Sequence, residues 1–388
     1  MKILILGSGL MGPAAAYNAI NDPDVTSVCI CDRDRGRLDA ALARLAQYDG
    51  AARLHGVQLD LAEHASAVKL FAGFDVIMAA LPWGASMLAF AAALEAHVPI
   101  VDFAIPGDDD LPVLRQQAEA AGCLIFLGCG LEPGLTEIVA RRLAGDLDSV
   151  SELHIKCGGV PAVPTGPLGY KIVFGGTQLP LRNTTALDVE QGVAQHVARY
   201  SGVEMLELAG VGECEAWHEG MMPWLLEMDE FRDITEGTQK TIRWPGYAAK
   251  ATVLLDLGLL GTAPIDVGGV PVIPKQVVDS VLAPHVTLHD GEEDITLFRV
   301  EVVGMRDGRR IMHRVDMVDR YDRVHGFTSM ARTTAFTGAI AARMVGRGDI
   351  RATGLHTSEA LITGPLYDRM MAELEAEGIH FEHSVHEL

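Results

Sequence analysis

The chain has few basic side chains for its acidic content, and it lacks any long apolar run. Thirty-one Lys and Arg residues stand against 52 Asp and Glu residues, which gives a formal net charge of −21 over 388 residues. This charge repels the phosphates of nucleic acids and of anionic lipids, so we expect neither nucleic acid nor a membrane as a partner. Met1 leads directly into a strand-like run without a signal-peptide pattern, so we predict neither export nor membrane insertion.

Cysteine is also scarce, and the six cysteines form no C-x-x-C pair. This spacing favours neither a zinc site nor a disulfide framework. Isolated thiols are typical of the reducing cytoplasm, so we predict a cytoplasmic protein without a metal site. The chain is rich in hydrophobic residues, at 49%, and too long for one hydrophobic core, which together indicate a globular protein of two domains.

The first twenty residues contain a glycine pattern in the setting that binds dinucleotides. Lys2–Leu6 has the composition of a buried strand, and an Ala-rich helix follows the G-x-G-x-x-G turn. The first glycine allows the tight turn, the second lets a pyrophosphate approach the backbone, and the third lets the helix pack close to the strand. The helix N-terminus attracts the phosphates. We therefore predict that NAD or NADP binds at this turn, which comprises Gly7, Ser8, Gly9, Leu10, Met11 and Gly12.

The end of the second strand is predicted to select between NAD and NADP. Ser27–Cys31 is strand-like and is followed by Asp32, 25 positions after Gly7. The Asp32 carboxylate should accept hydrogen bonds from the ribose hydroxyls and repel a 2′-phosphate, which favours NAD. Arg33 leaves NADP open, because a guanidinium can pair with a 2′-phosphate as well as begin the next helix as a solvated residue.

The rest of the first half alternates strands with helices, including the strands Val76–Ala80 and Ile100–Phe103. This order predicts an α/β fold with a Rossmann doubly wound parallel sheet. Ligands bind beyond the carboxyl ends of the strands in such sheets. We therefore expect the loops 80–84, 102–106 and 128–134 to line the cofactor cleft, with the cofactor in contact with Ala80, Leu81 and Pro82.

Longer strands separated by Gly- and Pro-rich loops begin at Glu152, and they predict an α+β domain with an antiparallel sheet. Arg306–Gly308 lies between two alternating stretches and predicts a hairpin turn. Thr333–Val345 and Leu366–Glu377 are predicted helices that pack back against the first domain.

Several stretches resemble the saccharopine dehydrogenase family, and within it the lysine 6-dehydrogenases, over nearly the whole chain. The most specific stretch is TIRWPGYAAKATVLLDLGLL (residues 241–260); the others are ALPW (80–83), VPIVDFA (98–104), GLEPGL (130–135), CGGVP (157–161) and GPLGYKIVF (166–174). The resemblance implies NAD(P)-linked chemistry at a carbon that bears an amine nitrogen. It also implies a homodimer, whose interface the long apolar strands of the second domain could supply.

The same resemblance divides the chain into three segments. Residues 1–133 correspond to the Rossmann dinucleotide-binding domain. Residues 134–332 correspond to an inserted α+β domain for substrate binding and dimerisation, and residues 333–388 to C-terminal helices that pack back on the Rossmann domain.

Oxidation of an amine by hydride transfer needs a neutral nitrogen, so we expect a base near the substrate. Asp102, at the end of a predicted strand, and Glu132, in a glycine-framed loop, are candidates, although each could instead cap a loop or a helix. His218, in a predicted loop, is the third candidate because the pKa of histidine suits proton transfer. Most histidines, however, are not catalytic.

Five residues are predicted to contact the substrate. Arg243 could hold an α-carboxylate through two parallel hydrogen bonds, or it could pair with an acidic side chain of the protein. Cys157 lies where the family's substrate is approached, and hydride transfer requires no nucleophile from it. Phe103, Tyr170 and Lys171 are predicted to line the pocket.

Three functional hypotheses follow. The leading one is an NAD(P)-dependent amino-acid or amine dehydrogenase that oxidises the ε-amine of lysine to an imine, which water then converts to a carbonyl compound and ammonia. The second is a saccharopine- or carboxynorspermidine-type reductase that joins an aldehyde and an amine. A requirement for a second carbon substrate in place of ammonia distinguishes the two. The third is a non-catalytic regulator that binds NAD(H).

Overall fold

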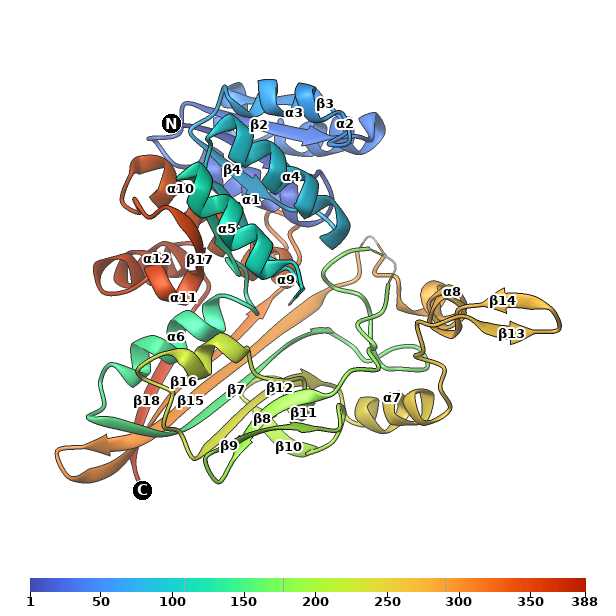
Figure 1. Cartoon of the computed structure of the whole chain (residues 1–388), viewed down its shortest axis with the longest axis vertical. Helices are drawn as coiled ribbons and strands as arrows, with labels where there is room; N and C mark the ends of the chain where they lie inside the picture. Colours follow the sequence, from blue (N-terminus) through green and yellow to red (C-terminus); the bar gives the residue numbers. More distant parts are fainter. Residues whose placement is uncertain (108, 177, 290) are drawn as a thin grey trace. The chain divides into compact units, whose positions relative to one another are not determined.

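The computed structural model describes the chain from Met1 to Leu388 except residues 108, 177 and 290 (Figure 1). The chain forms two compact units. The first comprises Met1–Ile138 and Ala331–Ile379, and the second comprises Val139–Met330 and His380–Leu388. In the described part of the chain, no helix is long and apolar enough to cross a membrane.

The first unit is built on a seven-stranded sheet in the order β17-β6-β5-β4-β1-β2-β3, and every pair is parallel. The chain runs outward from β1 to β3 and then from β4 to β6 in the other direction, so the switch point lies between β1 and β4. This confirms the predicted doubly wound parallel sheet. The strands are β1 (Lys2–Leu6), β2 (Ser27–Asp32), β3 (Leu54–Gln58), β4 (Val76–Ala79), β5 (Ile100–Asp102), β6 (Leu124–Leu127) and β17 (Gly354–Thr357).

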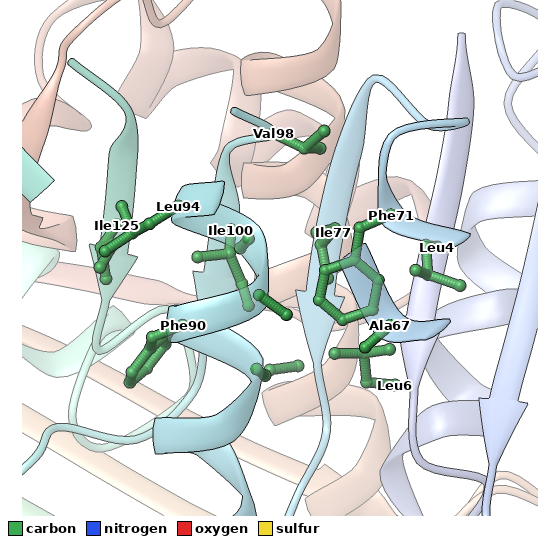
Figure 2. Close-up of a cluster of buried hydrophobic side chains, with 14 of the residues drawn as sticks. Leu4, Leu6, Ala67, Phe71, Ile77, Phe90, Leu94, Val98, Ile100 and Ile125 are labelled. Atoms are coloured by element: carbon green, nitrogen blue, oxygen red, sulfur yellow. The ribbon is translucent and has the colours of Figure 1, made fainter. Parts of the chain in front are cut away.

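A hydrophobic core packs the central strands of this unit against the helices beside them. Figure 2 shows Leu4 and Ile77 of adjacent central strands packed near Phe71, and Ile100 beside Phe90. Burial of each such side chain contributes about 1.5–3 kcal/mol. The helices are α1 (Met11–Ile20), α2 (Arg35–Leu45), α3 (His64–Phe71), α4 (Trp83–Ala96), α5 (Leu111–Ala121), α10 (Thr337–Arg347), α11 (Ser358–Leu361) and α12 (Pro365–Ala376), with a short 3₁₀ turn at Asp49–Arg53.

The second unit is built on a nine-stranded mixed sheet. The predicted antiparallel sheet is correct for most pairs, but β12 pairs with β7 in parallel. The predicted hairpin joins β15 to β16 through a turn at Asp307 and Gly308, both with positive φ. The strands are β7 (Ser149–Pro161), β8 (Ala186–Glu190), β9 (Val193–Val197), β10 (Glu204–Leu208), β11 (Gly212–His218), β12 (Glu236–Arg243), β15 (Asp294–Arg306), β16 (Arg309–Arg320) and β18 (Glu382–Glu387).

In the described part of this unit, three helices and a separate hairpin accompany the sheet. Two further segments lie where the units meet in the sequence. The helices are η2 (Pro223–Glu227), α7 (Tyr247–Asp256) and α8 (Pro274–Val286), and the hairpin is β13 (Ile265–Val267) with β14 (Val270–Val272). The junction segments are α6 (Leu135–Ala144) and the run of α9 (Ser329–Ala331) and η3 (Arg332–Phe336).

The C-terminus differs from its predicted place. Helices α10 and α12 belong to the first unit, but residues 380–388 belong to the second, where β18 pairs antiparallel with β16. The backbone of the last residues thus satisfies its hydrogen bonds at the open edge of the sheet, which a sequence-local pattern does not reveal. The segment 333–388 is therefore not a single helical segment on the first domain.

Candidate functional site

The glycine turn joins β1 to α1 in the geometry that a dinucleotide needs. Gly7 has φ +97°, which side chains rarely adopt, and a Cβ there would lie 2.4 Å from the Ala80 carbonyl oxygen. A Cβ on Gly12 would lie 1.9 Å from the Gly7 carbonyl oxygen, whereas the Cβ position of Gly9 has no heavy atom within 4 Å. Gly7 and Gly12 therefore close the turn, and Gly9 leaves its backbone open to a pyrophosphate. The turn fits NAD or NADP.

Asp32, the last residue of β2, is fixed by the glycine turn itself. Its Oδ2 accepts hydrogen bonds from the backbone nitrogen and the Oγ of Ser8, both at 2.7 Å, and its Oδ1 accepts one from the Asp34 nitrogen at 2.8 Å. Burial raises the pKa of Asp32, but these hydrogen bonds outweigh it and hold the pKa below its ordinary value. An ionised carboxylate at this place repels a 2′-phosphate, which supports the predicted preference for NAD.

Arg33 is exposed at the mouth of an open hollow of about 460 Å³ beyond the ends of β2 and β3. A hollow of this size suits the nucleoside end of a dinucleotide. Three acidic side chains accompany the one arginine, so the hollow disfavours an additional phosphate. The lining residues are Arg33, Asp34, Gln58, Leu59, Asp60 and Glu63.

Replacing Ser8 by alanine is expected to weaken NADH binding by about tenfold, because a hydrogen bond to a charged group is worth about 1.5–3 kcal/mol and the Ser8 backbone nitrogen still holds Asp32. NADPH binding should weaken less, since Asp32 already opposes the 2′-phosphate. Fluorescence titration of the purified protein with each nucleotide measures both affinities. Ser27→Ala, at the other end of β2, is the matched control and should change neither. Equal losses for the two nucleotides would contradict the discriminating role of Asp32.

The loops after β4, β5 and β6 meet at the carboxyl edge of the sheet, as predicted. The Ala80 nitrogen donates to the Leu6 carbonyl at 2.8 Å, which holds the loop after β4 against the glycine turn. The Cys129 nitrogen donates to the Asp102 carbonyl at 2.9 Å, which joins the loops after β5 and β6. Cofactor contact by Ala80, Leu81 and Pro82 stays a prediction.

Asp102 is a buried carboxyl group. It is 2% exposed, and its Oδ1 accepts a hydrogen bond from the Ala104 nitrogen at 2.9 Å. Burial raises the pKa of Asp102 to about 6, although hydrogen bonds from the Ala104 nitrogen and the Ser86 hydroxyl oppose this. A carboxyl group that titrates near neutral pH can take a proton from an ammonium group and return it.

Glu132 and Phe103 lie at the same edge of the first unit. Glu132 is partly exposed in a tight loop, where a Cβ on Gly134 would lie 2.3 Å from the Gly130 carbonyl oxygen. The Phe103 ring packs on Gly338 of α10, where a Cβ would lie 2.4 Å from the ring. The structure therefore brings both residues into the loop cluster that holds Asp102, and their roles stay predictions. No three or more His, Cys, Asp or Glu side chains among the described residues are grouped to hold a metal ion.

In the second unit, Arg243 lies among buried aromatic rings. Its guanidinium carbon is 4.7 Å from the ring centroid of Tyr170 and 5.8 Å from that of Tyr247. Trp217 stacks parallel to Tyr247 with centroids 6.1 Å apart. All four side chains are at most 7% exposed. We call these four residues the arginine–tyrosine cluster.

The arginine–tyrosine cluster has several polar atoms without a partner. Arg243 Nη1 donates to the Ile242 carbonyl at 2.8 Å, but Arg243 Nε, Tyr247 Oη and Trp217 Nε1 make no hydrogen bond. A hydrogen bond from the Arg243 side chain to the Tyr170 hydroxyl lowers the pKa of Tyr170, although burial outweighs it. Burial raises the pKa of both tyrosines, so their hydroxyls stay protonated donors. Because buried polar groups are nearly always satisfied, this concentration of free donors points to a bound group or ordered water. A guanidinium flanked by hydroxyl donors suits a carboxylate.

The C-G-G motif makes room for Arg243. A Cβ on Gly158 would lie 2.8 Å from Arg243 Nη1 and 2.2 Å from the Ile242 carbonyl oxygen, so only glycine lets β7 approach β12 here. Cys157 precedes it at 1% exposure, opposite Thr241 on β12 and Phe298 on β15. The structure thus gives the motif a packing role, and substrate contact by Cys157 stays a prediction.

Tyr170 and Lys171 are adjacent in the chain but have different surroundings. The Lys171 ammonium donates to the Thr287 carbonyl at 3.0 Å and lies 3.1 Å from the Glu292 carboxylate. Lys171 therefore links its segment to the residues before β15, whereas Tyr170 belongs to the arginine–tyrosine cluster.

His218 is the last residue of β11, not a loop residue as predicted. Its Nδ1 contacts the carboxylate of the buried Asp188 of β8. Its Nε2 packs against Gly202, where a Cβ would lie 1.7 Å from this nitrogen. Both ring nitrogens are covered, which favours a structural pair over a proton carrier.

Sequence reasoning did not identify two acidic residues near the arginine–tyrosine cluster. Glu215 is 5% exposed and accepts hydrogen bonds from the Gly246 and Ala248 nitrogens at 2.7 and 2.6 Å, at the start of α7. Glu219 forms an ion pair with Arg199 at 2.5 Å. The strand register sets Glu215 directly opposite Arg243, and the alternation of E-A-W-H-E was the available signal.

Replacing Glu215 by glutamine is expected to lower the stability of the second unit by about 2–3 kcal/mol, because one charge-assisted hydrogen bond to the start of α7 is lost and an amide donor then faces a backbone N–H. Thermal and urea unfolding measure the change. The control is Glu213→Gln on the same strand, whose side chain is exposed. Equal unfolding midpoints for Glu215→Gln and the parent protein would contradict this role.

Comparison with family models covers almost the whole chain. The model of the saccharopine dehydrogenase NADP-binding domain matches residues 3–124. The model of the saccharopine dehydrogenase C-terminal domain matches residues 130–379. The first range contains the glycine turn and Asp102, and the second contains the arginine–tyrosine cluster.

Two curated relatives align with the chain from end to end. The carboxyaminopropylagmatine dehydrogenase of Synechocystis sp. is 22% identical, with 95% of each chain covered. The carboxynorspermidine synthase of Vibrio alginolyticus is 23% identical, with 95% of this chain and 94% of that protein covered. The apo saccharopine dehydrogenase (L-Glu forming) of Saccharomyces cerevisiae superposes with a TM-score of 0.79 at 19% identity, with 99% of each chain covered, and so shares the fold.

Proposed function

The chain belongs to the saccharopine dehydrogenase family, and from this premise we propose that it forms or cleaves a secondary amine that carries a carboxylate, by NAD(P)-linked hydride transfer. Arg243 is the observation that supports the carboxylate in this proposal. Its guanidinium is buried beside the rings of Tyr170 and Tyr247, and polar atoms of the arginine–tyrosine cluster make no hydrogen bond. The names of the two end-to-end relatives both denote a carboxylated amine, which supports the same substrate class.

The residues of each unit have separate roles in this reaction. Bound NAD(P) supplies or accepts the hydride at the carbon that bears the nitrogen. In the first unit, the glycine turn and Asp32 hold the dinucleotide. Asp102 takes the proton from the substrate ammonium, so that the lone pair of the substrate nitrogen can support the developing iminium. In the second unit, Arg243 holds the carboxylate through parallel hydrogen bonds, with Tyr170 and Tyr247 as further donors.

Oxidative deamination of the lysine ε-amine is the second candidate. The resemblance of residues 241–260 to lysine 6-dehydrogenases, noted from the sequence, favours it. Both candidates need the same cofactor turn, base and carboxylate contact. They differ in whether the imine is formed with ammonia or with a second amine.

A substrate screen separates these candidates. Purified protein is assayed for NADH and NADPH oxidation with pairs of a carboxylate-bearing aldehyde and a diamine, and for NAD⁺ and NADP⁺ reduction with lysine, ornithine and other ω-amino acids. The proposal predicts reductive activity only when aldehyde and amine are both present. Reduction of NAD⁺ by lysine alone, with release of ammonia, would establish the second candidate instead.

A further inference from the structure

A hollow of about 550 Å³ lies at the amino ends of β1, β2 and β3, at the edge of the first unit's sheet that is opposite the glycine turn. Lys2 begins β1 and Gly7 follows its carboxyl end, and five residue steps of a strand span about 17 Å. The hollow is therefore separate from the cofactor turn. Its lining comprises Lys2, Ser27, His55, Ser66, Lys69, Leu70, Gly73 and Phe74.

The strand register places three polar side chains in a row across this edge of the sheet. Lys2 on β1 pairs with Ser27 on β2. His55 on β3 pairs with Cys29, which lies two residues after Ser27. Because residues two apart on a strand point to the same face, Lys2, Ser27 and His55 share one face of the sheet. The Ser27 hydroxyl lies 3.5 Å from His55 Nδ1, in agreement with this placement.

Helix α3 lies over the same face and adds polar side chains to the row. Farther along β1 this face is apolar, and Figure 2 shows Ala67 and Phe71 of α3 beside Leu4 and Leu6. At the amino edge, α3 instead contributes three residues spaced at i, i+3 and i+4 along one side of the helix, namely Ser66, Lys69 and Leu70. Polar side chains thus replace the core between this helix and the sheet.

Two lysines without ion pairs line this hollow in an acidic protein. The chain has seven lysines, and four of them form ion pairs with acidic side chains. Among the described residues, Lys2, Lys69 and Lys250 have no such partner, and the first two of these line the hollow. None of its eight described lining residues is acidic. In a chain of net charge −21, this local excess of positive charge favours a bound anion.

We propose that this hollow binds a small organic phosphate. The phosphate group carries a charge of about −1.5 to −2 at neutral pH, and lysine ammonium groups bind it as point charges. Lys2 and Lys69 supply these charges from the sheet and from α3. The hydroxyls of Ser27 and Ser66 and the imidazole of His55 donate further hydrogen bonds to the phosphate oxygens.

The other end of the hollow suits the carbon skeleton of such a ligand. Leu70 and Phe74 line it, and both are half-buried side chains that also pack against the core of the first unit. A volume of about 550 Å³ exceeds the needs of a phosphate ion and lies within the range of small-molecule sites. The apolar wall therefore favours a phosphate ester over inorganic phosphate.

Binding of phenyl phosphate to the full chain tests the proposal. The protein is first saturated with NADH, so that the glycine turn is occupied, and binding is measured by calorimetry in a buffer without phosphate. We expect one site with a dissociation constant of about 1 mM or lower. Inorganic phosphate should bind more weakly and phenol should not bind, because each lacks one half of the ligand. A parent protein that does not bind phenyl phosphate would overturn the proposal.

The double variant Lys2→Gln and Lys69→Gln locates the binding. It should raise the dissociation constant of phenyl phosphate by about 10–100-fold, because two charge-assisted hydrogen bonds are lost from an exposed site. The matched control is Lys250→Gln, an exposed lysine of α7 in the second unit, which should leave the constant unchanged. Equal binding by the double variant and the parent protein would overturn the proposal.

Acetylation of the parent protein keeps the test open if the double variant folds poorly. The protein is treated briefly with an N-hydroxysuccinimide ester of acetate, and mass spectrometry follows the modification of each lysine. Phenyl phosphate should slow the acetylation of Lys2 and Lys69 and leave that of Lys250 unchanged. Acetylation of Lys2 and Lys69 at the same rate with and without phenyl phosphate would contradict a phosphate site in this hollow.

Discussion

Replacing Arg243 by alanine is expected to lower kcat/KM for the carboxylated amine by about 10²–10⁴-fold. Two charge-assisted hydrogen bonds to a carboxylate are worth about 1.5–3 kcal/mol each, and losing both leaves the substrate charge beside buried tyrosines without a counter-charge. Because the carboxylate is bound in both the ground state and the transition state, most of the loss should be in KM. Steady-state kinetics with the substrate found in the screen measure kcat and KM of the variant and the parent protein.

Arg243→Lys is the matched variant for this prediction. Lysine keeps the charge but cannot make two parallel hydrogen bonds, so its activity should lie between those of the parent and the alanine variant. Binding of NADH, measured separately by fluorescence, should be unchanged in both variants, because the glycine turn belongs to the first unit. An Arg243→Ala enzyme with the parent KM would show that Arg243 serves only the packing of Tyr170 and Gly158.

Replacing Asp102 by asparagine is expected to lower kcat for amine oxidation by about 10²–10⁴-fold, the usual contribution of a general base. Burial raises the pKa of Asp102 to about 6. The parent rate of amine oxidation should therefore rise with pH through about 6 as the carboxylate forms, and the variant should lack this limb. A profile in which the variant keeps the limb would assign the base to another group, with Glu132 the next candidate.

The same carboxyl group should make stability depend on pH. Its folded-state pKa lies above the ordinary value of 3.8, so folding favours the protonated form. The protonated Asp102 carboxyl group therefore makes its full contribution to the free energy of unfolding below about pH 4. This contribution is lost as the pH rises through about 6. Asp102→Asn should accordingly unfold at a higher temperature than the parent at pH 8, by up to about 3 kcal/mol in free energy, and at nearly the same temperature at pH 4. A higher unfolding temperature for Asp102→Asn at pH 8 shows that the variant is folded, so that its low kcat reflects loss of the base.

The first unit could be predicted closely from sequence because its signals are local. The glycine spacing after a buried strand located the turn, and the apolar strands between helices gave the parallel sheet with its carboxyl-edge loops. Asp102 was found because it ends a strand at that edge. The burial that raises the pKa of Asp102 depends on the packing around it and could not be predicted from sequence.

The second unit was less predictable because its contacts join distant parts of the chain. The pairing of β12 with β7 in parallel, and of β18 with β16, brings together segments separated by many residues. His218 was assigned to a loop because its partner Asp188 lies 30 positions earlier. Glu215 was missed because its partners are the backbone nitrogens at the start of α7, and only the strand register places it opposite Arg243.

Isotope transfer tests the central claim, hydride transfer at a carbon bonded to an amine nitrogen. The purified protein is incubated with NADH or NADPH that carries deuterium at both C4 positions, together with the active pair of aldehyde and amine, and the product is examined by mass spectrometry and NMR. We predict a secondary amine with one deuterium on the carbon newly bonded to nitrogen. A reduced product whose deuterium lies on a carbon bonded to oxygen, or a secondary amine without deuterium, would contradict it.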